Sequence, residues 1–269
     1  MITEDGQRKR RKSLATEPRD SAGRMYHISL TKKDVGRVAF LPGDPGRVPL
    51  IAEHFKERRE VASHREYCTY GGYIGEEYVI ATSTGIGGPS TAIAIEELAR
   101  LGVKVMIRVG TCGGIPREAK VGSSVIADAA VALDGTSLQY APRGYPAAAT
   151  PGVVMALADS ASSLKKRHLV GLSASTDSFY VGQGREGYGG YFPSWQASLI
   201  SDLRQANVLC FEMESSTLFT LGRIYGLKTG ALFAVVANRA SDEFRQDAGL
   251  ADTILVATGS VKKFKKYGV

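Results

Sequence analysis

Apolar and polar residues follow two alternating patterns along this chain. Short, nearly continuous apolar runs indicate buried strands, whereas apolar residues spaced three to four positions apart indicate helices. The helical pattern covers residues 48–55, 91–101, 153–164, 217–225 and 250–266. Strands are expected at residues 38–41, 71–73, 77–82, 123–132, 169–175, 209–211 and 231–237, and at the start of the stretch 105–114.

Strands that alternate with helices indicate an α/β fold, with a largely parallel sheet covered on both faces and functional loops at the carboxyl ends of strands. The chain has 269 residues, of which 43% are hydrophobic and 23% charged, so it can bury a sizeable core. We find no internal repeat or linker. Residues 25–269 are therefore expected to form one domain.

The first 24 residues differ from the rest because they are polar and carry the basic run 8–12, part of a net charge of +7. Such a segment is typical of a disordered tail. It lacks the interleaved aromatics of nucleic-acid-binding modules, so nucleic acid is not an expected partner. No apolar run approaches the roughly 18–20 residues that span a membrane, and the polar N-terminus is no signal peptide. We expect a cytoplasmic protein without a membrane partner.

Three cysteines, Cys68, Cys112 and Cys210, lie far apart in the sequence. They are odd in number and form no C-x-x-C pair, which argues against a disulfide framework or a zinc site. We expect reduced thiols.

Candidate anion-binding chemistry centres on residues 105–114, where an apolar run ends in Arg108, Thr111 and three glycines. A strand would thus deliver a cation and a hydroxyl to a loop whose backbone N–H groups are closely approachable. Arg47 follows another strand and a Gly/Pro turn at the start of a helix, whose N-terminus favours anions. Arg65 is a third candidate. The alternatives are an Arg108 paired with an acid and a turn in which Asp44 pairs with Arg47.

Residues 82–90 form a second glycine-rich loop between a strand and a helix. They superficially resemble a dinucleotide-binding loop, but Ser90 stands where the last glycine belongs, and no acidic residue follows a second strand about 20 residues later. A Rossmann-type site is therefore poorly supported.

Two later segments carry further candidate groups. Residues 176–185 combine aromatic rings with Gln183 and Arg185, which suits stacking on a planar heterocycle and hydrogen bonding to its edge. Glu212 and Glu214 flank Met213 between a strand and a helix. Such carboxylates can perform acid–base catalysis, or one can grip the vicinal hydroxyls of a sugar. An irregular surface loop remains the alternative for the glycine-rich segment.

With these groups placed, the chain resembles the nucleoside phosphorylase-I family, and most closely its uridine-cleaving members, from about residue 26 to the C-terminal helix. The resemblance implies reversible phosphorolysis of uridine to uracil and ribose 1-phosphate. It also implies an α/β fold with a mixed, partly closed central sheet, and a homo-oligomer, commonly a trimer of dimers. The matching motifs are GDPGR at 43–47, SHRE at 63–66, STGIGGPS at 83–90, RVGTCG at 108–113, FYVGQGR at 179–185 and EMES at 212–215.

The resemblance assigns roles to individual residues, with Arg65 and His27 reaching into a neighbouring subunit's site. Arg108, Gln183, Arg185 and Glu214 would be catalytic. Phosphate would contact Gly43, Arg47, Arg65, Arg108 and Thr111; ribose would contact His27, Met213 and Glu214; the base would contact Thr111, Gly113, Phe179, Gln183, Arg185, Glu212 and Arg239.

No cofactor is expected, since inorganic phosphate is a co-substrate. Glu66, the Ile86 carbonyl and Ser90 match a position where the family can hold a monovalent cation such as K⁺ between subunits. The alternative is a Glu66 that pairs with a neighbouring base.

Purine-specific relatives usually carry a Ser-Asp pair where this chain has Ala237 and Asn238, which favours a pyrimidine base. The alternative functions are a purine-nucleoside phosphorylase, a nucleosidase of the same fold that uses water, and a non-catalytic nucleoside-binding protein.

Overall fold

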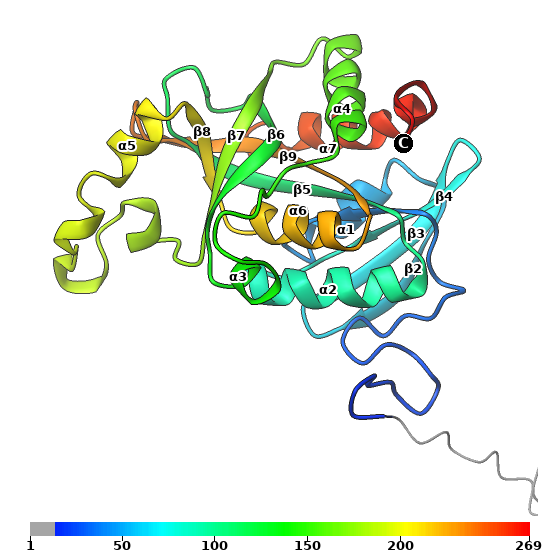
Figure 1. The fold of residues 1–269 in the computed structure, drawn as a ribbon. Coiled ribbons are helices and arrows are strands. Elements are labelled where there is room, and N and C mark those ends of the chain that lie inside the picture. The colour runs from blue at the N-terminus through cyan, green and yellow to red at the C-terminus, as the bar shows by residue number, and fades with distance from the viewer. Residues whose placement is uncertain (1–13) are drawn as a thin grey trace, which may run out of the picture.

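The structure, a computed structural model, describes residues 14–269, and the expected apolar runs within them become strands of one sheet (Figure 1). The strands are β1 (Val38–Leu41), β2 (Lys56–His64), β3 (Tyr67–Ile74), β4 (Glu77–Thr82), β5 (Val105–Gly114), β6 (Ser124–Leu133), β7 (His168–Thr176), β8 (Val208–Glu212), β9 (Lys228–Asn238) and β10 (Glu243–Phe244).

The strand order is β10-β9-β6-β7-β8-β5-β1-β4-β3-β2, and β9 also pairs with β5. This additional pairing closes β5, β8, β7, β6 and β9 into a ring. Strand β9 pairs with a different strand on each edge. Its residues 228–238 run parallel to β5, while residues 231–234 pair antiparallel with β6. The mixed, partly closed sheet of the expected fold class is thereby confirmed.

The largely parallel sheet expected from the alternation of strands and helices is present only in part. The pairs β1–β4, β1–β5, β5–β9, β6–β7 and β7–β8 are parallel. Strands β2, β3 and β4 form an antiparallel meander, and β5 pairs antiparallel with β8. Only a short connection joins β3 and β4, so they form a hairpin, because a parallel pair would need a crossover of a dozen or more residues.

Helices cover the sheet on both sides (Figure 1). Helices α2 and α6 pack against each other in one layer, while α4 and α7 pack together in the other. The helices are α1 (Arg47–Ala52), α2 (Gly88–Leu101), α3 (Ser137–Tyr140), α4 (Pro151–Ser163), α5 (Leu199–Gln205), α6 (Ser215–Ile224) and α7 (Leu250–Ser260), with 3-10 turns η1 (Val181–Gln183), η2 (Tyr188–Gly190), η3 (Ser194–Gln196) and η4 (Val261–Tyr267).

The core divides into two large clusters because successive strand residues point to opposite faces of the sheet. On β5, Met106 packs in the cluster that includes α2 and α6, whereas Val105 and Ile107 pack in the cluster that includes α1, α4 and α7. The sheet is therefore buried on both sides, which explains why β1 and the first half of β5 read as continuous apolar runs.

Strands β2 and β10 and helices α3 and α5 lie outside the elements expected from the sequence. The last expected helix ends as the 3-10 turn η4 rather than as α-helix. In the predicted tail, the basic run 8–12 lies outside the described residues. Residues 14–24 follow turns, in which Asp20 accepts hydrogen bonds from the backbone N–H groups of Ala22 and Arg24. No helix among the described residues has both the length and the apolar content to cross a membrane.

Candidate active site

Strand β5 carries three of the predicted site residues, and Arg108 among them is buried, with 5% of its surface exposed. Its Nη1 donates to the Thr84 hydroxyl at 2.9 Å, and its Nη2 lies 2.7 Å from Glu214 Oε2. Arg108 is thus paired with an acid, which was the alternative interpretation of this residue from the sequence. The acid is Glu214, the residue predicted to hold ribose.

The third guanidinium nitrogen of Arg108 leaves a donor unused. Its Nε is buried and has no hydrogen-bond partner within the described residues. Gly43 lies beside the same side chain, since a Cβ added at Gly43 would lie 3.0 Å from Arg108 Nη2. The close approach of the backbone at residue 43 thus depends on glycine.

Arg47 lies beside Arg108 and Thr111. It is the first residue of α1, and its Nη1 lies 3.5 Å from the Thr111 hydroxyl. Asp44 also contacts it, but at 3.9 Å, while its carboxylate accepts a 2.8 Å bond from the Gly46 N–H. Burial lowers the pKa of Arg47, and the charge of Arg108 lowers it further against the opposing effect of Asp44. Two neighbouring guanidinium groups that both remain charged form a strongly positive locus.

Glu214 joins this locus to the starts of two helices. Its Oε1 accepts a 2.8 Å bond from the N–H of Gly87, the residue that precedes α2, and Glu214 itself directly precedes α6. A carboxylate at helix N-termini is favoured by the helix dipole. The Met213 N–H also lies 3.3 Å from Glu214 Oε2, so the Met213–Glu214 backbone is folded tightly around the carboxylate.

Gln183 and Arg185 form a second polar cluster. The buried Gln183 amide donates to Thr176 Oγ1 at 3.3 Å and accepts a 2.8 Å bond from Arg185 Nη1. The guanidinium of Arg185 stacks 4.1 Å from the ring centre of Phe179 and donates to its carbonyl at 2.7 Å. The ring, amide and guanidinium are thus held together in one unit.

This second cluster is attached to β5 and β9. Arg239, just after β9, donates from Nη2 to the Gly184 carbonyl at 2.9 Å and from its backbone N–H to Gly114 at 2.8 Å. Burial and the charge of Arg239 both lower the pKa of Arg185. A Cβ at Gly113 would lie 3.9 Å from Arg185 Nη2, so β5 runs from the Arg108 cluster to the Arg185 cluster.

The carboxylate of Glu212 is bound by groups of β7 and by backbone groups at the start of α6. Its Oε2 accepts bonds of 2.8 and 2.7 Å from the N–H groups of Glu214 and Ser215, and its Oε1 accepts from the hydroxyls of Ser173 and Ser175. Burial raises the pKa of Glu212, as does the charge of Glu214. The carboxylate therefore caps the start of α6.

His27 and Arg65 form a separate group near the N-terminal segment. His27 Nδ1 lies 2.7 Å from the buried Glu97, which also accepts from the backbone N–H of residues 27 and 28. Arg65 lies 5.4 Å from the ring centre of Tyr26 and donates to its hydroxyl at 3.2 Å. Within residues 14–269 these contacts hold both side chains away from the Arg108 cluster.

The residues matched to a cation position lie close together around Gly85. The Ser90 hydroxyl donates to the Ile86 carbonyl at 3.1 Å, and a Cβ at Gly85 would lie 2.9 Å from Glu66 Cγ and 3.1 Å from Ser90 Oγ. Among the described residues, no group of three His, Cys, Asp or Glu side chains is arranged to hold a metal ion.

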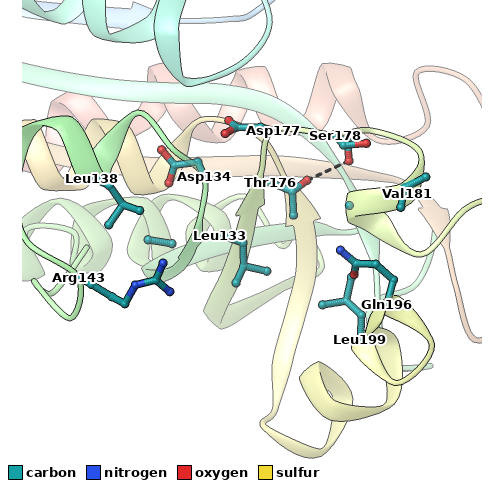
Figure 2. Close-up of a pocket in the computed structure, with 12 residues that line it drawn as sticks. Leu133, Asp134, Leu138, Arg143, Thr176, Asp177, Ser178, Val181, Gln196 and Leu199 are labelled. Atoms are coloured by element: carbon teal, nitrogen blue, oxygen red, sulfur yellow. Dashed lines mark hydrogen bonds between the residues drawn. The ribbon is translucent and has the colours of Figure 1, made fainter. Parts of the chain in front are cut away.

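A pocket of about 460 Å³ that the sequence did not reveal lies beside the segment that carries Gln183; Figure 2 shows the residues that line this pocket. It shares Thr176 and residues 181–182 with the segment that carries this cluster. Figure 2 shows Arg143 and Leu138 on one side of this pocket and Gln196 on the other. Its lining combines residues of the 176–185 segment with residues 132–143 and 196–199, which belong to no quoted motif. The sequence did not indicate that these segments would meet.

Asn238 was noted where purine-specific relatives carry an acid. Its amide group donates 2.8 Å bonds to the carbonyls of Pro116 and Ala119, and its oxygen accepts from the N–H groups of Ala240 and Ser241. The side chain is therefore fully engaged by backbone groups.

Comparisons with known proteins were made for the whole chain. The family model described as the phosphorylase superfamily matches residues 37–266. A uridine phosphorylase from Thermococcus kodakarensis is 52% identical over 248 residues, covering 92% of this chain and 89% of that protein. A uridine phosphorylase from Treponema pallidum is 41% identical, covering 84% of this chain and 86% of that protein. A guanosine phosphorylase from Halorubrum lacusprofundi is 37% identical, covering 79% of this chain and 83% of that protein.

The buried Arg108–Glu214 pair leads to a prediction about stability. Arg108→Met should lower the free energy of unfolding by about 3–5 kcal/mol, because it leaves a buried carboxylate without its cation. Adding Glu214→Met should recover part of that loss. Guanidinium unfolding at one fixed protein concentration measures both. Arg100→Met, at an exposed pair with Glu96, is the control and should change stability by less than about 1 kcal/mol. A double variant no more stable than Arg108→Met would contradict the pairing.

Proposed function

Because the chain belongs to the phosphorylase superfamily, we propose that it catalyses the reversible phosphorolysis of uridine to uracil and ribose 1-phosphate. The carrying observation is that one strand, β5, joins a buried arginine cluster to the Gln183–Arg185 cluster, with Glu214 beside it. The arginine cluster suits an anion, Glu214 suits a sugar, and the Gln183–Arg185 cluster suits a planar base. This order matches phosphate, ribose and base in a bound nucleoside and phosphate.

Phosphate binds at the Arg47–Arg108 locus. Guanidinium groups suit phosphate oxygens and stay charged at working pH. The unpartnered Nε of Arg108 and the backbone at Gly43 supply further possible contacts, because a buried donor without a partner is costly unless a ligand satisfies it. Thr111 adds a hydroxyl next to Arg47.

Breaking a glycosidic bond passes through a sugar with cationic character. Phosphate held below the anomeric carbon stabilises that charge, and the phosphate oxygen forms the new bond as the bond to the base nitrogen breaks. Glu214 grips the ribose hydroxyls beside Met213. Its pairing with Arg108 supports a sugar site directly next to the phosphate site.

The departing uracil carries away the electron pair of the broken bond. Gln183 and Arg185 stabilise this charge by hydrogen bonds, and Phe179 packs on the base. The stacking of Arg185 on Phe179 orients the guanidinium before the substrate arrives. Arg239 supports both residues through the Gly184 carbonyl, while Gly113 allows the base to approach β5 closely.

A pyrimidine base is favoured over a purine. The Asn238 amide is engaged by four backbone groups and supplies no acid to protonate a purine ring nitrogen. The relative named as a guanosine phosphorylase keeps purine phosphorolysis as the second candidate. A nucleosidase has less support, since its attacking group is water and the arginine cluster would then bind no phosphate.

We further propose a homo-oligomer with shared sites, built from dimers and assembled as a trimer of dimers. Arg65 and His27, which lie apart from the Arg108 cluster in one chain, reach phosphate and ribose in the neighbouring subunit. The reaction requires no cofactor, and K⁺ at Glu66, Ile86 and Ser90 supports the interface between subunits. The three thiols are free, in keeping with a cytoplasmic location.

Product analysis tests the reaction directly. Uridine and phosphate should yield uracil and ribose 1-phosphate, whereas omitting phosphate should abolish release of the base. Inosine in the same assay should react at least about tenfold more slowly, because a recognition site built from specific hydrogen bonds rejects a base that leaves them unpaired. Phosphate-independent release would favour a nucleosidase, faster inosine cleavage a purine enzyme, and binding without turnover a non-catalytic protein.

A mixing experiment tests the shared site. Arg65→Ala and Arg108→Ala should each be nearly inactive alone. After the two are unfolded and refolded together, random pairing in a two-fold dimer should restore about one quarter of the sites, since each mixed dimer contains one site with both arginines. A mixture that stays inactive, although light scattering shows assembled protein, would place both arginines in a site within one subunit.

A further inference from the structure

Asp134 is a buried acid that the proposed reaction does not use. It follows the last residue of β6, and only 3% of its surface is exposed. Asp134 lines the pocket of Figure 2, as do Leu138 and Arg143. No cationic side chain pairs with Asp134 anywhere in residues 14–269. A buried carboxylate without a cation must be stabilised by hydrogen bonds.

Four donors supply those bonds. Asp134 Oδ1 accepts from the hydroxyls of Ser137 at 2.8 Å and Ser216 at 2.5 Å. Its Oδ2 accepts from the Ser137 N–H at 2.7 Å and the Thr217 hydroxyl at 3.2 Å. The carboxylate therefore joins the start of α3 to the first turn of α6.

Side chains outside α6 bind the N–H groups of its first turn. Glu214, the residue before the helix, makes no side-chain cap bond to it. The cap comes instead from Glu212, which accepts from the Ser215 N–H at 2.7 Å, and from the Ser175 hydroxyl, which accepts from the Ser216 N–H at 2.9 Å. Asp134 completes this arrangement by binding the side chains, and its negative charge suits the helix N-terminus.

Little space remains for α6 to shift. A Cβ added at Gly88, the first residue of α2, would lie 2.6 Å from Thr136 Oγ1 and 2.8 Å from Thr217 Oγ1. The starts of α2, α3 and α6 therefore meet at one point, immediately beside Glu214. A displacement of about 1 Å in catalytic groups can cost about a hundredfold in rate.

We propose that Asp134 is a positioning residue, which fixes the first turn of α6 and thereby holds Glu214 where it meets both Arg108 and the ribose. This inference rests on the proposed function. Asp134 touches no substrate. It acts through Ser216 and Thr217, so its removal acts first on the sugar-binding carboxylate, while Arg108 keeps its bond to Thr84.

Two substitutions at Asp134 separate its hydrogen bonds from its charge. Asp134→Asn keeps one oxygen for the Ser137 N–H and Thr217, while its NH₂ group faces the hydroxyls of Ser137 and Ser216, which can rotate to accept. It should keep the KM for uridine within about threefold. Asp134→Ala removes all four bonds and should raise that KM at least about tenfold, the effect of losing a bond to a charged group. The KM for phosphate should change less than threefold in both.

Ser216→Ala and Ser137→Ala are a matched pair, because each deletes one hydroxyl bonded to Asp134 Oδ1. Only Ser216→Ala loosens α6, so it alone should raise the KM for uridine. It also keeps the proposal testable if Asp134→Ala does not fold. Equal effects from the two serine variants, or a uniform loss in all variants including Asp134→Asn, would overturn the proposal in favour of a purely structural role.

Hydrogen exchange of the Ser215 and Ser216 amides, without substrates, makes the test independent of turnover. Exchange should accelerate about tenfold in Ser216→Ala and remain unchanged in Ser137→Ala. If wild-type protein failed to cleave uridine, the proposed function would fall, while this difference would still support the attachment of α6 through Asp134. Equal exchange rates in the two variants would refute that attachment.

Discussion

The buried pair of Arg108 and Glu214 is the interaction on which the candidate site depends. Removing two charges from water costs several kcal/mol each, and their attraction repays that cost only when further hydrogen bonds satisfy both groups. Thr84 supplies one bond to the guanidinium, and the Gly87 N–H supplies one to the carboxylate. These bonds offset part of the cost of burying the pair, while Arg108 Nε has no partner among the described residues.

The pair also links three elements. Arg108 lies on β5, while Glu214 precedes α6 and accepts a bond from the N–H of Gly87 before α2. Glu212 and Asp134 bind the first turn of α6 as well. Three carboxylates therefore surround one helix start, and within residues 14–269 only Glu214 pairs with a cation. We interpret the other two as the support that keeps Glu214 available for substrate.

The sequence was a good guide wherever one segment carried the information. The apolar run of β5, the glycines near Arg108 and the cluster of Phe179, Gln183 and Arg185 are all local, and the structure brings these residues together as their motifs indicated. The roles given to them remain predictions. The closure of the sheet was not apparent from strand patterns, because β9 pairs with β5 and β6 through contacts between distant segments. The resemblance to a family supplied that information.

Asp134 shows the limit of a sequence argument more sharply. An aspartate after a strand usually indicates a turn or helix cap, and Asp134 does cap the start of α3. Its two bonds to α6 cross more than 80 positions of sequence, so no local pattern could predict them. The same reason explains why the pocket beside it was missed.

Calorimetric titration of inorganic phosphate into the protein tests the central claim most directly. If Arg108 anchors phosphate while it pairs with Glu214, Arg108→Gln should weaken phosphate binding at least about tenfold. Arg143→Gln, at the pocket of Figure 2, should leave the Kd unchanged. An unchanged Kd in Arg108→Gln would contradict the account, because the buried pair would then serve the fold alone.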